Sequence, residues 1–161
     1  MRLFIAIQLS DEMKKALVAC MHDLKKQGVE GNYVPAQNLH MTLAFIGEYD
    51  NPGKVKEVIG KVPLPEFRIS LSEKGNFGNI LWAGVKGNQK LKTYVKDLRA
   101  ALSAEGISFD KDKFIPHITL IRKYSVKKPY QFHLPKAEMT VKKASLMKSE
   151  QKSGKIVYKE L

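Results

Sequence analysis

The sequence has few of the features that mark secreted or membrane-embedded proteins. It contains one cysteine, Cys20, so no disulfide can form within the chain. No segment approaches the roughly 18 to 20 consecutive apolar residues that a membrane-spanning helix needs. The first apolar run, within residues 1–12, is short, is followed at once by acidic residues and lacks a small-residue cleavage site. We therefore expect a cytoplasmic protein whose chain opens with a β-strand.

Acidic residues are scarce relative to basic ones, and the deficit is confined to one half of the chain. The whole sequence has 28 Lys and Arg residues against 16 Asp and Glu, a formal net charge of +12. Residues 1–80 carry a net charge of +1, whereas residues 81–161 carry +11. A nucleic acid is a natural partner for such a surface, but a lysine-rich solubilising surface has the same composition. Charge alone therefore does not decide the function.

The order of predicted elements indicates an α+β fold in a single domain, residues 1–161. The first half predicts a strand at 2–9, a helix capped by Ser10 and ended by Gly28, one or two strands in 33–47, a short helix capped by Asn51, and two antiparallel strands in 66–86. The second half predicts a helix at 88–106 and strands at 117–122, 130–135, 138–150 and 155–161. No low-complexity segment or long linker interrupts them.

Two of the four histidines occur in the same short motif, once in each half. His40 and Thr42 lie in HMTL, and His117 and Thr119 lie in HITL. Side chains at positions i and i+2 of a strand point to the same side, so each strand presents an imidazole and a hydroxyl on one face. One such pair is commonly structural, because threonine is favoured in strands and histidine is tolerated there. Its repetition points to a shared site.

Two such strands facing each other would form a metal-free site for cleaving a phosphodiester. One imidazole can activate the attacking oxygen while the other protonates the leaving oxygen, and the hydroxyls can hold the phosphoryl oxygens. An in-line displacement needs the acid and the base on opposite walls, which two lobes meeting at a cleft would supply. We expect the chain to cross between lobes near residues 84–90. A zinc site would need a third ligand, and Glu48 and Asp50 are expected in solvent.

These motifs and their surroundings resemble the two-histidine phosphoesterase superfamily, and most closely its RNA 2',3'-cyclic phosphodiesterase branch, the 2'-5' RNA ligase family. The likeness includes RLFIAI, VPAQNLHMTLAFIGE, ILWAGV, FIPHITLIR and LMKSEQKSGKIVYKEL, which together span almost the whole chain. It implies a bilobal α+β fold with two pseudo-symmetric lobes, each with an antiparallel sheet and flanking helices, around a central cleft. It also implies hydrolysis of a 2',3'-cyclic phosphate at an RNA end to a 2'-phosphomonoester, together with reversible 2'-5' RNA ligation.

The resemblance assigns roles that the residues themselves leave open. It implies His40 as the proton donor to the 3' oxygen and His117 as the proton acceptor that activates water, although both strands offer the same groups. Thr42 and Thr119 inherit the phosphate-binding role, with no metal and no ATP or other cofactor expected. Arg122 would add positive charge beside the phosphate. Because it lies an odd number of positions after His117, it needs a bend in the strand to point inward.

Several alternatives stay open on sequence alone. Phe45, Phe77, Trp82 and Tyr33 could stack on a terminal base, but core packing is the favoured use of each. The substrate could be another small cyclic phosphate or a 2'-5'-linked oligonucleotide in place of an RNA end. The chain could also be an RNA-binding module without catalysis, against which the intact set of two histidines and two threonines argues. We expect a monomer.

Overall fold

The computed structural model describes all residues, 1–161, and contains three α-helices, a short 3-10 helix and nine β-strands. The helices are α1 (Asp11–Lys26), α2 (Pro52–Lys61) and α3 (Gln89–Ala104), and the 3-10 helix is Ala36–Asn38. The strands are β1 (Arg2–Gln8), β2 (Glu30–Tyr33), β3 (His40–Glu48), β4 (Phe67–Phe77), β5 (Ile80–Val85), β6 (His117–Ser125), β7 (Glu138–Val141), β8 (Ser145–Lys152) and β9 (Lys155–Glu160).

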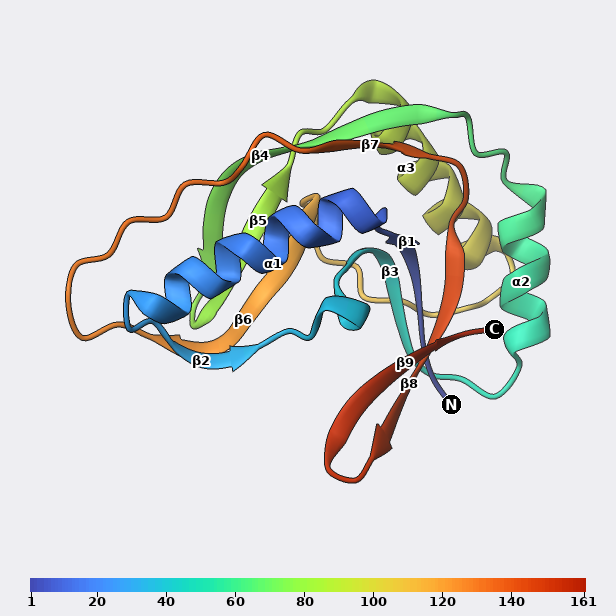
Figure 1. Cartoon of the computed structure of the whole chain (residues 1–161). Coiled ribbons are helices and arrows are strands. Elements are labelled where there is room, and N and C mark those ends of the chain that lie inside the picture. The colour runs from blue at the N-terminus through green and yellow to red at the C-terminus, as the bar shows by residue number, and fades with distance from the viewer.

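The strands form two antiparallel sheets (Figure 1). The four-stranded sheet has the order β3-β1-β8-β9, and the five-stranded sheet has the order β2-β6-β5-β4-β7. Strand β1 reads RLFIAIQ and is buried over residues 3–7, which explains its central place between β3 and β8. The predicted fold class, α+β with two antiparallel lobes, is confirmed.

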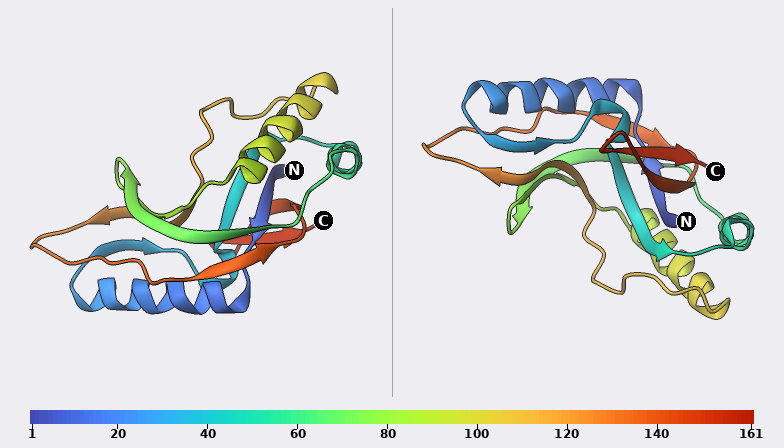
Figure 2. Two further views of the ribbon diagram at one scale, coloured as in Figure 1. Left: turned by 90° about the horizontal axis from the view of Figure 1, so that it is seen from above. Right: turned by 90° about the horizontal axis from the view of Figure 1, so that it is seen from below.

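Helix α1 covers the five-stranded sheet, and α2 and α3 lie beside the four-stranded sheet (Figure 1). Figure 2 shows α1 and α3 on opposite sides of the molecule. The predicted caps are present: the hydroxyl of Ser10 accepts from the Met13 amide at 3.2 Å, and the Asn51 side chain accepts from the Lys54 amide at 3.2 Å. Buried side chains of both sheets and all three helices form one core cluster, so the two sheets share a single hydrophobic interior.

The sheets do not correspond to the two halves of the sequence, which corrects the predicted crossing near residues 84–90. Those residues join β5 to α3, and α3 leads to β6 in the same five-stranded sheet. The chain passes between sheets before β2, before β3, before β4 and between β7 and β8. The reason is that β1 is buried on both sides and takes its two neighbours, β3 and β8, from opposite ends of the chain.

Three predictions of strands need correction. The predicted strand at 138–150 is two strands, since β7 ends at Val141 in the five-stranded sheet and β8 begins at Ser145 in the four-stranded sheet. The predicted strand at 130–135 is irregular, although Phe132 is buried; Pro129 and Pro135, which bound it, lack the amide hydrogens that a sheet ladder needs. Conversely, β2 has the polar sequence EGNY and pairs with β6. Its Gly31 lies so close to β6 that an added Cβ would be 2.9 Å from the Arg122 carbonyl oxygen, so pairing here requires glycine.

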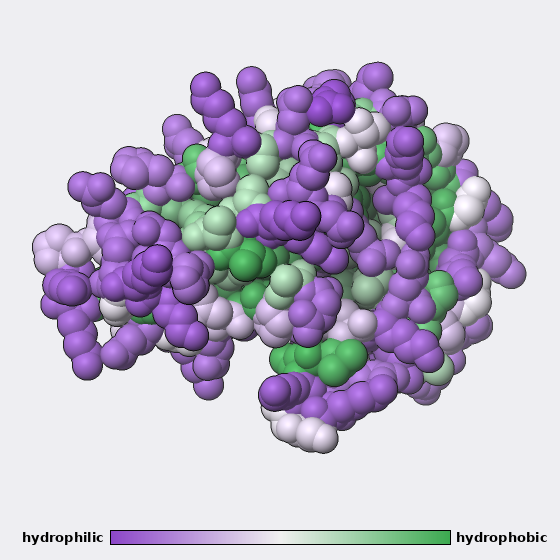
Figure 3. Space-filling model, in the orientation of Figure 1, coloured by the Kyte–Doolittle hydropathy of each residue, from purple (hydrophilic) through white to green (hydrophobic).

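The outer surface is mainly hydrophilic on the face drawn in Figure 3, in keeping with the excess of lysine. An apolar patch interrupts it where the β8–β9 hairpin projects from the body (Figures 1 and 3). The exposed apolar side chains of this hairpin are Ile156, 43% exposed, and Val157, 37% exposed. No helix has the length and apolar content that crossing a membrane requires.

Candidate active site

The two motif histidines occupy equivalent places, each as the first residue of its strand. His40 opens β3 in the four-stranded sheet, and His117 opens β6 in the five-stranded sheet. His40, Thr42, His117 and Thr119 are all half-buried, while the residues between and after them, such as Met41 and Ile118, are fully buried. The alternation predicted from sequence is therefore present in both strands, and each strand is held by its apolar face.

Both imidazoles are anchored by the same hydrogen bond. The Nδ1–H of His40 donates to the carbonyl of Asn38 at 2.7 Å, and the Nδ1–H of His117 donates to the carbonyl of Ile115 at 2.6 Å. A carbonyl oxygen can only accept, so these bonds fix the tautomer with the hydrogen on Nδ1. Nε2 is then the nitrogen of each ring that can accept or release a proton toward a ligand. The Nε2 of His40 lies 2.9 Å from the hydroxyl oxygen of Thr42.

Each imidazole is also held between two aromatic rings. The His40 ring lies 4.9 Å from Phe4 and 5.1 Å, edge-on, from Tyr158, whereas the His117 ring lies 5.1 Å, edge-on, from Phe77 and 5.6 Å from Trp82. These contacts leave each ring few alternative orientations. Gly75 makes room for the Trp82 indole, since an added Cβ there would come within 2.2 Å of the indole ring. The aromatic support thus comes from a different sheet for each histidine.

The same irregularity occurs in both strands directly after the threonine. Ile5 and Ala6 of β1 pair with Ala44 and Thr42, so Leu43 is an extra residue in β3. In β6, Leu81 and Trp82 pair with Ile121 and Thr119, so Leu120 is the extra residue. Such bulges place two consecutive side chains in the core and then shift the alternation by one position.

The bulges bring the fifth residue after each histidine back to the face of the motif. In β6 this residue is Arg122, half-buried after the buried pair Leu120 and Ile121. In β3 the equivalent residue is Phe45, half-buried after Leu43 and Ala44. The bend that Arg122 needs in order to point inward is therefore present. The two walls differ at this position, since one carries a cation and the other carries a phenyl ring.

Thr42 of β3 and His117 of β6 line the same cavity, so charged groups of β6 act on the pKa of His40. Burial is the largest influence and lowers the pKa of His40 below its ordinary value of 6.5, because the charged imidazolium loses hydration. The Asn38 carbonyl opposes this by favouring the charged ring, whereas the positive charges of Arg122 and His117 lower the pKa further. The lowered pKa favours the neutral form of His40 in the free protein. The two histidine walls interact across one cleft.

A cavity of about 450 Å³ opens between the two walls and extends away from Thr42 and His117. Its other side is the loop that precedes β6, represented by Asp110, Asp112 and Phe114. Arg99 of α3 also lines the cavity and fixes this loop. Its Nε and Nη2 donate to the Leu43 carbonyl at 3.2 and 3.0 Å, and its Nη1 donates to the Asp112 carbonyl at 2.9 Å. One guanidinium therefore joins β3 to the segment that leads into His117.

Residues 14–153 match the 2'-5' RNA ligase superfamily. The chain belongs to this superfamily. Its curated relatives include a protein from Thermotoga maritima named RNA 2',3'-cyclic phosphodiesterase, which is 34% identical over 132 residues, or 76% of this chain and 70% of that protein. A protein of the same name from Geobacillus stearothermophilus is 33% identical over 138 residues, or 80% of this chain and 44% of that protein.

Solved structures agree with membership of the 2'-5' RNA ligase superfamily. The crystal structure of E. coli LigT complexed with 3'-AMP is 28% identical to this chain, with a TM-score of 0.87. The alignment covers 99% of this chain and 94% of LigT. A crystal structure of a Thermus thermophilus protein is 29% identical, with a TM-score of 0.81, and the alignment covers 100% of this chain and 95% of that one. The superfamily resemblance predicted from the two motifs is confirmed.

The aromatic residues considered from sequence divide into two groups in this superfamily member. Phe45 and Phe77 line the cavity beside Thr42 and His117, and Phe77 is 41% exposed. Trp82 packs against His117 with the ring centroids 5.6 Å apart, and Tyr33 donates its hydroxyl hydrogen to the Val29 carbonyl at 2.5 Å. The cavity residues of the loop, and Arg99, were not anticipated, because no local sequence signal places a helix arginine on a distant strand.

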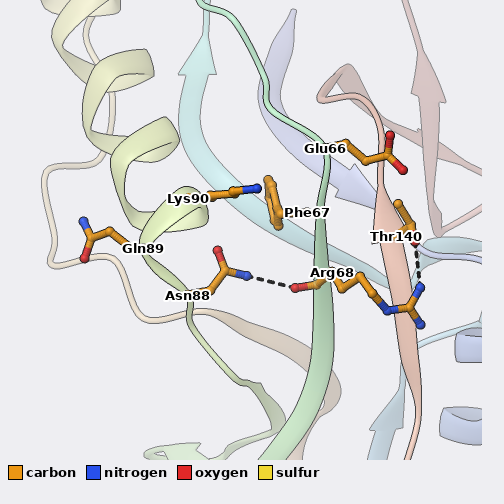
Figure 4. A pocket seen from close by; sticks show the side chains of 7 residues that line it. All are labelled: Glu66, Phe67, Arg68, Asn88, Gln89, Lys90 and Thr140. Atoms are coloured by element: carbon orange, nitrogen blue, oxygen red, sulfur yellow. Dashed lines mark hydrogen bonds between the residues drawn. The ribbon is translucent and has the colours of Figure 1, made fainter.

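A second cavity, of about 680 Å³, contains none of the predicted site residues (Figure 4). It lies at the start of α3, between Asn88 and Lys90 on one side and Arg68 and Thr140 on the other. Three of its lining residues are joined by hydrogen bonds: Asn88 donates to the Arg68 carbonyl at 2.9 Å, and Arg68 donates to Thr140 at 2.8 Å and also pairs with Glu138 at 2.8 Å. The structure also brings together no group of three or more His, Cys, Asp or Glu side chains suited to a metal.

Proposed function

We propose that this protein hydrolyses RNA 2',3'-cyclic phosphate ends to 2'-phosphomonoesters by metal-independent acid-base catalysis with His40 and His117. The observation that carries the proposal is the duplicated wall: two imidazoles with the same Nδ1 anchor, each beside a threonine, that interact electrostatically across one cleft. The names of the curated relatives support the same reaction.

In the proposed mechanism the cyclic phosphate lies between the two walls. The Nε2 of His117 accepts a proton from a water molecule, whose oxygen attacks phosphorus. The bond between phosphorus and O3' breaks, and the Nε2–H of His40 gives its proton to O3'. One water is consumed, and the product carries a 2'-phosphate and a free 3'-hydroxyl. The same sequence with a 5'-hydroxyl in place of water would break the bond between phosphorus and O3' and join two RNA ends through a 2'-5' linkage.

His40 must be charged to act as the acid, yet burial lowers its pKa in the free protein. A bound phosphodiester places a negative charge beside the ring, and an opposite charge favours the protonated form. Substrate binding would therefore raise the pKa of His40, so that His40 is protonated when the substrate is bound. Thr42 and Thr119 hold the non-bridging oxygens by donating their hydroxyl hydrogens, and Arg122 neutralises the charge that develops on the phosphoryl group.

The test is product analysis with an oligonucleotide that ends in a 2',3'-cyclic phosphate, in the presence of a chelator. We expect a 2'-phosphomonoester, which chromatography and mass spectrometry distinguish from the 3' isomer and from intact substrate. No hydrolysis by the wild type would refute the proposal, and tight RNA binding without turnover would favour a binding module. A requirement for added metal would refute the metal-independent mechanism.

A further inference from the structure

The two edge strands of the four-stranded sheet meet at His40. The order of this sheet is β3-β1-β8-β9, so β1 and β8 lie between β3 and β9 in the hydrogen-bonded ladder. The ring of Tyr158 in β9 nevertheless lies 5.1 Å from the ring of His40 at the start of β3, and 5.0 Å from the ring of Phe4 in β1. The sheet is therefore curled so far that its last strand covers the face that carries His40.

The side chain of Asn38 joins the two edges of this curled sheet. Its Nδ2 donates to the main-chain carbonyl of Ile156 in β9 at 3.0 Å. Asn38 is 7% exposed, whereas asparagine is mostly found at protein surfaces. Because a buried carboxamide is costly unless its polar groups have partners, this bond favours one position of β9 beside the segment that leads into β3.

The main chain of Asn38 holds His40 itself. The Asn38 carbonyl accepts from the Nδ1–H of His40 at 2.7 Å. This carbonyl belongs to the 3-10 helix Ala36–Asn38, in which Ala36 and Gln37 are exposed and only the Asn38 side chain is hydrogen-bonded to another element. One residue thus fixes two contacts of the His40 ring: its carbonyl holds Nδ1, and its carboxamide holds the strand that carries Tyr158.

The other histidine has no such link. The carbonyl that anchors His117 belongs to Ile115, which is 40% exposed and has no polar side chain. The rings against His117, Phe77 and Trp82, come from β4 and β5, the strands that follow β6 in the order of the five-stranded sheet. Ladder hydrogen bonds between these neighbouring strands already hold those rings in place. A side-chain bond across the sheet is therefore required beside His40 and not beside His117.

We propose that Asn38 is a positioning residue for His40, holding Tyr158 against the imidazole through β9 and holding Nδ1 through its carbonyl, so that Nε2 faces the substrate. The inference rests on the proposed phosphodiesterase activity and adds a residue that acts through the catalytic acid. A general acid works only while it lies within hydrogen-bond reach of the oxygen that it protonates. Loss of the Asn38 carboxamide should therefore lower kcat more than it weakens substrate binding.

The first measurement is the tautomer of each histidine, which long-range proton–nitrogen NMR correlations report without any substrate. In the wild type at alkaline pH we expect the hydrogen of both His40 and His117 on Nδ1, and slow solvent exchange of the Asn38 side-chain amide. Asn38→Leu keeps the number of side-chain heavy atoms but has no donor. In this variant His40 should shift toward the Nε2–H tautomer that an unanchored imidazole prefers, while His117 stays unchanged.

The second measurement is the hydrolysis of a cyclic-phosphate-ended oligonucleotide. Asn38→Leu should lower kcat by about 10- to 100-fold with little change in KM. In a His40→Ala background, Asn38→Leu should cause no further loss, because the ring through which Asn38 acts is already absent. The matched control is Val157→Ala, which shortens an exposed side chain of the same strand. This control should keep both tautomers and the wild-type kcat.

Two results in the wild type alone would overturn the inference: an Nε2–H tautomer of His40, or rapid exchange of the Asn38 side-chain amide. An unchanged His40 tautomer with wild-type kcat in Asn38→Leu would also overturn it. So would a further loss in the His40→Ala background as large as the loss in the wild type, because Asn38 would then act on the fold in general. If the wild type hydrolyses no cyclic phosphate, the proposed function fails, whereas the tautomers still test the link between Asn38 and His40. The two failures are therefore distinguishable.

Discussion

Strands β3 and β6 begin with the same pattern, and comparing them separates what the fold duplicates from what it varies. Both start with a histidine anchored to the carbonyl two residues before it, and both bulge at the residue after the threonine. They differ in their partners, since β3 lies in the four-stranded sheet and β6 in the five-stranded sheet. The shared features hold the two imidazoles in equivalent positions, and the differing features surround each imidazole with different side chains.

The difference is clearest at the fifth position after each histidine. Arg122 places a positive charge near His40, whereas Phe45 lines the cavity. A symmetric site with two arginines would bind phosphate more strongly but could not tell one side of the substrate from the other. The two imidazoles are anchored in the same way, so the motifs themselves do not say which one is the acid and which the base. Only the neighbouring side chains, such as Arg122 and Phe45, distinguish them.

The largest expected effect is the loss of either imidazole, which tests whether both walls are catalytic. His40→Ala and His117→Ala should each lower kcat on a cyclic-phosphate-ended oligonucleotide by about 100- to 10,000-fold. His22→Ala, on the exposed side of α1, is the matched control and should retain wild-type kcat. Steady-state kinetics on the three variants checks this. Near-normal activity of His40→Ala or of His117→Ala would refute catalysis by both histidines.

Removing the charge at Arg122 tests whether this residue of β6 stabilises the phosphoryl group. Arg122→Met should lower kcat/KM by about 10- to 100-fold, because a charge-assisted hydrogen bond to the phosphoryl group is worth about 1.5–3 kcal/mol. Lys123→Met removes a cation from the next position, which is exposed, and should have a much smaller effect. Equal losses in the two variants would mean that Arg122 acts only through the general positive field of the surface.

Arg99 tests whether the two walls must be tied together. Arg99→Met removes three hydrogen bonds to main-chain carbonyls of β3 and the loop, and should lower the free energy of unfolding by about 2 kcal/mol. Arg99→Lys keeps the charge but loses the forked geometry, so it should restore only part of this stability. Denaturant unfolding of the wild type and the two variants measures the free energy of unfolding. A wild-type value for Arg99→Lys would show that the charge matters and the forked geometry does not.

The smallest expected effect is on the pH dependence of stability. Burial lowers the pKa of His40 in the folded protein, so the unfolded chain binds more protons below pH about 6.5. The contribution of neutral His40 to stability is therefore lost as the pH falls from about 6.5 through its lowered pKa. His40→Gln should lose less stability than the wild type between pH 7 and pH 5, whereas exposed His22→Gln should behave like the wild type. Urea unfolding at both pH values measures the change in the free energy of unfolding. The same change in all three proteins would contradict the prediction.

Much of the site was readable from sequence because its signals are local. The H-x-T spacing gave the shared face of each strand, and the caps at Ser10 and Asn51 gave two helix starts. The inward turn of Arg122 also had a local signal that the prediction did not use. Leu43-Ala44 and Leu120-Ile121 are consecutive apolar pairs that break the alternation at the same point of both motifs.

The strand pairing could not be read in this way, because it depends on contacts between distant parts of the chain. Nothing near β1 shows that its neighbours are β3 and β8, so the lobes were assigned to the two halves of the sequence and the crossing was placed near 84–90. The polar strand β2 was missed because its pairing depends on the space beside Gly31 and β6, not on its own composition. The anchoring of the loop by Arg99 is likewise a tertiary contact.

The most direct test of the central claim, that equivalent walls perform opposite proton transfers, is the pH dependence of the residual activity in the two single-histidine variants. If His40 is the acid, His40→Ala depends only on neutral His117, so its rate should rise with pH to a plateau and lose the fall at alkaline pH. His117→Ala should depend only on charged His40, so its rate should fall as the pH rises and lose the acidic limb. The opposite pair of profiles would exchange the two roles, and bell-shaped profiles in both variants would contradict catalysis by this pair.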